Sequence, residues 1–575
     1  MTSLVHAYLP PALERGRAWG FALNLYALRS SRNWGIGDFG DLQQFVRWSA
    51  AVGVDAVGVN PLHALHYMEP EAASPYSPTS RYHLNPLYIQ IEAVPEYRSA
   101  ASAARALRER VASPPFARTL DDLRATTHVA YARVARAKWS ALGVLYDVLR
   151  DERGERAAAF RSFVATGGER LERFAVYEAL TERFATDQGR IRGWLTWPAE
   201  FREPGSDAVG TWAAKMRRRV EYFKYLQWVA DEQLAAAADA ARDLSIGLYL
   251  DVAVGVDVNS ADVWSDLGAY VLDETIGAPP DPLGPNGQNW GLPPLEPMTM
   301  LRDGGAAFSE LLRANMAHAG ALRLDHVMAL LRLFRIPRGK SPAEGTYVAY
   351  PFDELIGLAR TESERRHCLI VGEDLGNVPD GFRERMERER IFSYRLLLFE
   401  RDADGRFRPP SAYPTYALAT ATTHDVPTLI GWATGRDLDV RATIGTVTSD
   451  VAREAHAFRR TDVSRLLDAL ASEGELDAAH FQALHETLDA HSQNPAAFDA
   501  LLRGAYRYLA KTPARLVLVQ LDDACRELEQ INLPGTFTEY PNWRRKSRLD
   551  LDGVARNDLI AALVDDVRTR VREGP

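Results

Sequence analysis

Eight short apolar runs divide this chain at uneven intervals, and few folds use so many. Each run is rich in β-branched, aliphatic or aromatic side chains, and longer helical or loop-rich stretches separate the runs. Near-continuous apolar strands are typical of parallel sheets buried on both faces, so the pattern predicts an α/β fold, a (β/α)8 or TIM barrel. The predicted strands span residues 20–25, 55–60, 247–252, 320–324, 369–372, 394–399, 418–421 and 516–520.

The uneven spacing of these strands predicts two insertions. The stretch between the second and third strands is far too long for one crossover helix, and its apolar residues, such as Phe223 and Leu226, recur at helical spacing. We therefore expect a large, mainly helical insertion at 95–242 and a smaller helical insertion at 435–505, between the seventh and eighth strands. The whole chain, 1–575, is then a single catalytic barrel that carries both.

The overall charge argues against a nucleic-acid partner. The formal net charge is −9, and no basic stripe interleaved with aromatic residues occurs.

Cys368 and Cys525 are the only cysteines, and both lie in apolar or amphipathic stretches, so we expect reduced packing residues in a cytoplasmic protein. The first residues do not resemble a signal peptide, and no apolar run approaches the length of a membrane span. We therefore expect an uncharged substrate, and no nucleic-acid or membrane partner.

Three acidic residues follow predicted strands and form the candidate catalytic set. Asp325 follows the fourth strand, Glu373 follows the fifth, and Asp425 lies shortly after the seventh. Because the carboxyl ends of parallel strands meet at one rim of a barrel, we expect these three side chains to lie together. Retaining cleavage of a glycosidic bond needs a carboxylate nucleophile, a protonated acid about 5 Å away, and usually a group that holds the distorted sugar. The sequence offers one residue for each role.

The neighbours of these carboxylates indicate how each is tuned. Arg323 and Asp325 share a face of their strand, so the guanidinium keeps Asp325 ionised. The apolar approach to Glu373 and the adjacent Asp374 both favour a neutral carboxyl, as a general acid requires. Neighbouring strands lie about 4.8 Å apart, which fits the close carboxylate pair of a retaining site. Each feature alone equally fits a structural role: an Arg–Asp plug of the barrel end, a helix N-terminal acid, and an N-cap at Asp425.

Aromatic residues in two loops are candidates for stacking on sugar rings. Trp290 lies in the Gly- and Pro-rich segment 284–293, where an indole has little core to enter, and Tyr76 lies in a Ser-Pro-Tyr-Ser-Pro segment. Loops above a barrel commonly carry its specificity, so we expect both residues to contact substrate, together with Asn289 of the first loop. Trp34, in the loop after the first strand, equally fits a residue that braces the barrel rim.

Seven motifs occur in a fixed order along nearly the whole chain. They are SRNWGIGDFGDL at 31–42, SPYSP at 74–78, GPNGQNWGLP at 284–293, LRLDH at 322–326, GEDLG at 372–376, THD at 423–425 and NWRR at 542–545. In this order they strongly resemble the motifs of the 4-α-glucanotransferases known as amylomaltase or disproportionating enzyme, relatives of the α-amylase superfamily. One departure is the Val-Pro pair after Asp425, where many short amylomaltases have Asn-Asp. The last motif fits either closure of the site or an anchor for the C-terminus, and we expect the anchor.

The resemblance implies roles for the residues that match its motifs. It implies that Asp325 is the nucleophile, Glu373 the acid/base and Asp425 the transition-state stabiliser. It further implies that Arg323, His326 and His424 bind sugar hydroxyls or tune these carboxylates. It also implies that Asp251, Tyr76 and Trp290 line the glucan path. No cofactor is needed, and because no calcium-binding carboxylate cluster of the amylase kind is evident, we expect no metal.

The expected activity is the transfer of α-1,4-glucan (maltooligosaccharide) segments to the 4-hydroxyl of an acceptor glucan or glucose, by a retaining double displacement. An α-glucan hydrolase shares every catalytic residue and stays open as an alternative. A catalytically inactive glucan-binding protein with the same barrel is an alternative from another class. We expect a monomer or a weak homo-oligomer.

Overall fold

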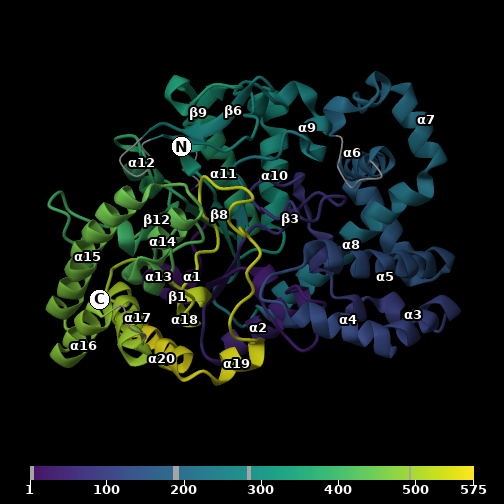
Figure 1. The fold of residues 1–575 in the computed structure, drawn as a ribbon. Coiled ribbons are helices and arrows are strands. Elements are labelled where there is room, and N and C mark those ends of the chain that lie inside the picture. The colour runs from purple at the N-terminus through teal and green to yellow at the C-terminus, as the bar shows by residue number, and fades with distance from the viewer. Residues whose placement is uncertain (1–5, 186–192, 281–285, 491–493, 575) are drawn as a thin grey trace.

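A closed barrel of eight parallel strands forms the centre of the molecule (Figure 1). The computed structural model describes residues 6–185, 193–280, 286–490 and 494–574. Each barrel strand lies next to its neighbour in the chain, and the last strand pairs with the first, so the predicted (β/α)8 fold is confirmed. The strands are β1 (Ala18–Leu23), β2 (Ala56–Val59), β5 (Gly247–Val252), β8 (Ala321–Leu324), β11 (Leu369–Gly372), β12 (Phe392–Leu396), β13 (Ala417–Thr420) and β14 (Leu516–Gln520).

Two predicted strands extend too far towards the C-terminus. β1 ends at Leu23 and the chain continues into the 3₁₀ helix Leu25–Ala27, while β12 gives way to the 3₁₀ helix Leu397–Phe399. Leu25 and Leu397 are as fully buried as the strand residues. Hydrophobicity reports burial and not backbone conformation, so it does not mark where these strands end.

Packing inside the barrel depends on two glycines. A Cβ on Gly20 of β1 would lie 2.1 Å from the carbonyl oxygen of Ala56, and a Cβ on Gly58 of β2 would lie 2.8 Å from the Tyr249 ring. Larger residues at these positions would force the strands or the Tyr249 ring to move. The amino-terminal helix α1 (Pro11–Arg15) contributes the buried Leu13, which belongs to the same core cluster as Tyr249.

Helices cover the barrel on its outside, as expected for this fold. The register of the barrel then fixes which residues meet at its rim: Asp251 on β5 pairs with Arg323 on β8, and Leu324 pairs with Gly372 on β11. The main covering helices are α2 (Phe39–Ala51), α10 (Ala306–Met316), α11 (Phe352–Arg366), α12 (Phe382–Arg388), α13 (Leu429–Thr434), α17 (Pro495–Ala510) and α20 (Asp558–Glu573).

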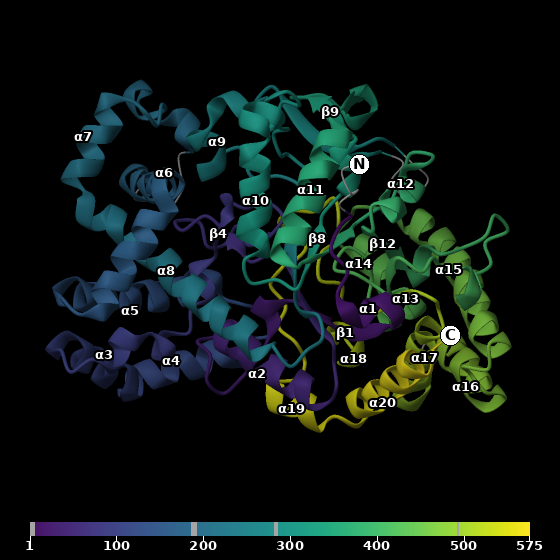
Figure 2. The ribbon, with the colours of Figure 1, turned by 180° about the vertical axis from the view of Figure 1, so that it is seen from behind.

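Both long connections are helical. The helices between β2 and β5 extend to one side of the barrel, and those after β13 extend to the other (Figure 2). The last helix of the first group packs against α2 as well as α6, so it joins this group to the barrel shell. The first group comprises α3 (Ser102–Ala112), α4 (Pro114–Ala125), α5 (Tyr131–Asp151), α6 (Glu155–Phe184), α7 (Asp207–Lys215) and α8 (Arg217–Ala240). The second comprises α14 (Arg436–Thr443), α15 (Ser449–Ser472) and α16 (Ala478–Asp489).

Two small sheets outside the barrel were not expected from the sequence. One is antiparallel and four-stranded, with the order β10-β9-β6-β7, and the other pairs β3 with β4. Their strands are short and lie in loop-rich sequence, so no alternating pattern identifies them. Their bounds are β3 (His63–Ala64), β4 (Ser80–Leu84), β6 (Glu274–Ala278), β7 (Gln288–Asn289), β9 (Arg332–Pro337) and β10 (Thr346–Ala349). Among the described residues, no helix is both long and apolar enough to cross a membrane.

Candidate active site

Two of the three candidate carboxylates lie at the matched ends of neighbouring strands. Asp325 is the first residue after β8, and Glu373 is the first residue after β11. The amide of Glu373 donates to the Leu324 carbonyl at 3.0 Å, which continues the strand pairing as far as Glu373. The structure thus brings the two predicted residues together at one rim of the barrel.

Arg323 connects Asp325 to the neighbouring strand. Its guanidinium lies 2.9 Å from a carboxylate oxygen of Asp325 and 2.9 Å from both oxygens of Asp251 on β5. Arg323 and Asp251 are both buried. Burial raises the pKa of Asp251, the Arg323 charge opposes this, and the Asp325 charge adds to it. One cation therefore bridges two carboxylates and holds Asp325 beside Asp251.

Glu373 lies in a very different environment. Burial raises its pKa to about 7, although Arg323 opposes this, and the negative charge of Asp325 raises it further. Two backbone amides hold the carboxylate in place: His326 donates to Oε2 at 2.9 Å and Leu375 donates to Oε1 at 2.7 Å. A carboxyl group with this pKa carries a proton in a useful fraction of molecules near neutral pH, as a general acid needs.

Asp374 turns away from this pair. Its carboxylate accepts hydrogen bonds from the Arg383 guanidinium at 2.8 Å, the Ser393 hydroxyl at 2.5 Å and the Tyr394 amide at 2.8 Å. These partners tie the end of β11 to β12, so Asp374 has a structural role.

Asp425 is held by two neighbours. His424 lies 3.1 Å from one of its carboxylate oxygens, and the Asn532 side-chain amide donates to the other at 2.7 Å. Removal from water raises the pKa of Asp425, but the His424 charge and the hydrogen bonds from His424 and Asn532 outweigh this and lower the pKa to about 2. No helix begins at Asp425, because the N-cap of α13 is Thr428. The N-cap alternative for Asp425 is therefore wrong.

Tyr76 lies where the loop after β3 reaches the barrel mouth. Its hydroxyl donates to Asp251 at 2.6 Å, and its ring stacks on His424 with centroids 4.7 Å apart. The Trp543 ring lies 5.5 Å from Tyr76 and 5.2 Å from His424. Tyr76 and His424 therefore join Asp251 and Arg323 in one connected group.

The sequence did not indicate Asn532 as a site residue, and it left two roles open for Trp543. We expected the 542–545 motif to anchor the C-terminus instead of closing the site, and the Trp543 carbonyl does accept a bond from Tyr131 at 2.7 Å. The same residue also places its indole against the site. Its motif was visible in the sequence, whereas a single asparagine in a loop gives no signal. Trp34, by contrast, is buried and donates to Glu92 at 2.8 Å, which fits a brace.

The loop that carries Trp290 lies against His326. Residues 284 and 285 of the 284–293 segment are outside the described residues. The indole and the imidazole meet edge to face with centroids 5.2 Å apart, and the indole Nε1 donates to Gln288 at 3.0 Å. Asn289 is exposed, and its side-chain oxygen accepts from the Gly291 amide at 2.9 Å. In this structure Asn289 therefore shapes the loop.

His326 has an unusual backbone. Its φ of +47° lies in the left-handed region, which a non-glycine residue adopts at a cost. This turn directs its amide at Glu373. Burial lowers the pKa of the imidazole to about 4, although Asp325 opposes this, so the ring is neutral at physiological pH. In the described part of the chain, no three His, Cys, Asp or Glu side chains are grouped so that they could hold a metal ion.

The fold and the carboxylate pair together define a class of protein: barrel enzymes that act on glycosidic bonds with carboxylates at the carboxyl ends of their strands. Residues 23–550 match the family model described as 4-alpha-glucanotransferase. The chain belongs to this 4-α-glucanotransferase family.

Individual relatives agree with the family. A 4-alpha-glucanotransferase of Haemophilus influenzae is 38% identical over 96% of this chain and 79% of its own length. One of Mycobacterium tuberculosis (H37Rv) is 36% identical over 93% and 72%. The crystal structure of amylomaltase from Corynebacterium glutamicum superposes with a TM-score of 0.84 and 30% identity, covering 96% of this chain and 75% of that one. Amylomaltase from Streptococcus agalactiae, solved with acarbose, shares the fold with a TM-score of 0.73, 18% identity and coverage of 97% and 99%.

Proposed function

We propose that Asp325, Glu373 and Asp425 perform the 4-α-glucanotransferase reaction of this family by a retaining double displacement. Glu373 protonates the oxygen of the α-1,4 bond while Asp325 attacks the anomeric carbon, so the C–O bond breaks and a glycosyl ester forms. Glu373 then takes the proton of an acceptor 4-hydroxyl, whose oxygen displaces Asp325 and restores an α-1,4 bond. The observation that carries the proposal is the pair of carboxylates on neighbouring strands, one held by Arg323 and the other buried.

The remaining residues are proposed to hold the sugar. Asp425, with its low pKa, stays ionised and can accept bonds from hydroxyls of the flattened, oxocarbenium-like ring. Asp251, Arg323, Tyr76 and His424 are linked to one another beside this position. The substrates we propose are α-1,4-glucan donors, with maltooligosaccharides or glucose as acceptors. The cysteines are buried and unpaired, which supports our proposal of a cytoplasmic location.

Incubation of the purified protein with maltotriose tests the activity directly. A ladder of longer oligosaccharides together with glucose is the expected product, because each transfer shortens one molecule and lengthens another. Shortening without any longer product would establish a hydrolase, and unchanged maltotriose that still binds would establish a glucan-binding protein.

Trapping of the ester tests the division of roles between the carboxylates. In Glu373→Gln, a glycosyl fluoride donor should still react, because fluoride needs little protonation to leave. The adduct should then accumulate, and peptide mass spectrometry should locate it on Asp325. In Asp325→Asn no adduct should form, and turnover should fall at least a hundredfold. At about 1.36 kcal/mol per tenfold, this loss corresponds to a rise of about 2.7 kcal/mol in the activation free energy. An adduct on another carboxylate would overturn the assignment.

A further inference from the structure

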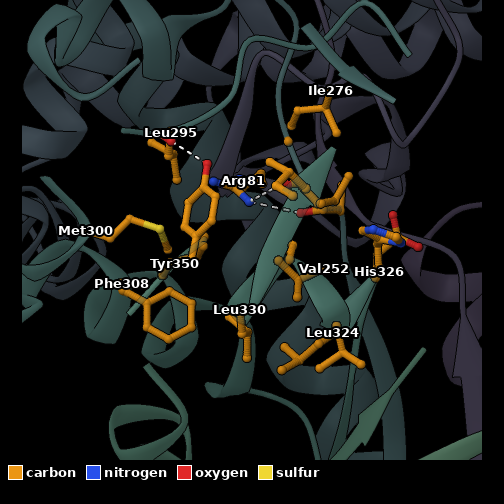
Figure 3. A pocket seen from close by; sticks show the side chains of 18 of the residues that line it. Arg81, Val252, Ile276, Leu295, Met300, Phe308, Leu324, His326, Leu330 and Tyr350 are labelled. Carbon is orange, nitrogen blue, oxygen red and sulfur yellow. Dashed lines mark hydrogen bonds between the residues drawn. The ribbon is translucent and has the colours of Figure 1, made fainter. Parts of the chain in front are cut away.

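A cavity lies outside the barrel, between the barrel wall and the four-stranded sheet (Figure 3). Its volume is about 80 Å³. One side is formed by the ends of β5 and β8, and the others by α10, β6, β9 and the segment after the Trp290 loop. Most lining side chains are apolar, including Val252, Ile276, Met300, Phe308, Leu324 and Leu330.

The cavity lies on the opposite face of the strands from the catalytic groups. Val252 and Leu324 line it, whereas their chain neighbours Asp251 and Arg323 line a separate, polar cavity inside the barrel. Successive residues of a strand point to opposite faces, so the wall of the barrel separates the two spaces. At the strand end the two spaces adjoin, because Asp325 and His326 also line the outer cavity.

One buried cation lines this apolar space and has an unused donor. Arg81, on β4, is 7% exposed and lines the cavity. Its NH1 group donates to the carbonyls of Ala253 at 3.1 Å and Val254 at 2.8 Å, but its Nε has no hydrogen-bond partner. The rest of this guanidinium has partners, because it hydrogen-bonds the Tyr270 hydroxyl and lies in the field of the buried Asp262 carboxylate. A buried donor without an acceptor costs about 1–3 kcal/mol, so an incoming oxygen has a site ready for it.

We propose that this cavity binds a small aromatic or cyclic molecule that carries one acceptor oxygen, either an alcohol or a carboxylate. The ring packs among Met300, Phe308 and Leu330, and the oxygen faces Arg81. A glucan does not fit this chemistry, because its many hydroxyls would lose water against walls that offer few partners.

Three probes that share one ring test the proposal by calorimetric titration of the purified protein: toluene, benzyl alcohol and benzoate. We expect saturable binding at one site, with at least one oxygen-bearing probe held fivefold or more tightly than toluene. Arg81→Met should remove this preference while toluene still binds, which also shows that the cavity is intact. Equal affinities for all three probes in the wild type would overturn the role of Arg81.

A variant at the mouth of the cavity tests the location. Met300 is half-buried, so Met300→Trp should fill the mouth and weaken every probe at least tenfold. Met298→Trp is the matched control, because Met298 is 71% exposed and is not part of the lining. If Met300→Trp lowers the melting temperature, Leu330→Phe fills the same space from within.

Competition separates this cavity from the glucan site. A saturating mixture of maltooligosaccharides should leave probe binding within twofold of its value without sugar. Displacement of the probe by sugar, no saturable binding, or equal effects of the variants at 298 and 300 would each overturn the proposal.

Discussion

At the residue scale, the two candidate catalytic carboxylates have opposite surroundings. Asp325 faces the Arg323 guanidinium at 2.9 Å, whereas Glu373 is buried beside a negative charge and is bonded by two amides. Burial raises the pKa of Glu373 to about 7, which suits a general acid, and the Arg323 salt bridge holds Asp325 in place for the role of nucleophile that we propose.

A pH profile measures this difference. The pKa of Glu373 is raised to about 7, and its protonated form is the active one, so kcat/KM should fall as pH rises through about 7. Asp425, with a pKa of about 2, stays ionised throughout the working range and adds no acidic limb there. Initial rates on maltotriose between pH 4 and 10, with stability checked at each pH, give the profile. A rate that stays constant up to pH 9 would contradict the assignment, and the limb should disappear in Glu373→Gln with an activated donor.

Asp425→Asn should lower kcat at least a hundredfold while KM changes only a few-fold, because its proposed contacts form mainly with the distorted sugar. Asn532→Ala should give a smaller loss of about tenfold, since it only frees one oxygen of Asp425 to move. Steady-state kinetics on maltotriose, with melting curves for both variants, provide the comparison. If Asp425→Asn loses thermal stability while kcat per folded molecule stays normal, Asp425 is a structural residue.

At the scale of elements, the barrel strands were predictable and the small sheets were not. A barrel strand is apolar along its whole length because both of its faces are covered, so it stands out in the sequence. β7 has two residues, and β6 pairs with β9 across a long stretch of chain, so local patterns contain no trace of this sheet. The contact of Asn532 with Asp425 is equally non-local. The positions of Asp325 and Glu373 could be predicted from the ends of the strands. The contacts between loops, such as that of Asn532 with Asp425, could be identified only in the structure.

The four-stranded sheet explains how the Trp290 loop is held. The Trp290 amide donates to Ile276 of β6 at 2.9 Å, so the loop is fixed to an ordered sheet beside His326. We propose that this fixed indole binds an acceptor sugar and keeps water from the ester.

Trp290→Ala should therefore raise the ratio of hydrolysis to transfer several-fold, while the first step with an activated donor changes much less. Glucose release and oligosaccharide growth from maltotriose, measured together, give the ratio. Tyr347→Ala is the matched control, because Tyr347 is a partly exposed aromatic residue on β10 of the same sheet. A ratio that stays constant while both rates fall would show that Trp290 supports the donor side or the fold.

At the scale of the whole molecule, buried polar contacts attach the first helical group to the segment that follows β4. Lys138 on α5 is fully buried, and its ammonium donates to the carbonyls of Leu87 at 2.6 Å and Ile89 at 2.8 Å. Burial lowers the pKa of Lys138, against the charges of Asp38 and Asp41. These bonds join α5 to the loop after β4. They therefore hold the first helical group, which extends to one side in Figures 1 and 2, to the rest of the fold.

Lys138→Met keeps the length of the side chain but leaves both carbonyls without their donor. At about 1–3 kcal/mol for each unsatisfied group, less the desolvation that the charge no longer costs, we expect a loss of about 2–4 kcal/mol in unfolding free energy. Arg218→Met is the control within the same helical group, because the Arg218–Asp147 pair is largely exposed and should contribute less than about 1 kcal/mol. Urea melts, with kcat measured per folded molecule, distinguish the outcomes. Equal stability of the two variants would show that Lys138 does not hold the first helical group to the loop after β4. A loss of kcat without a loss of stability would indicate that this helical group takes part in catalysis.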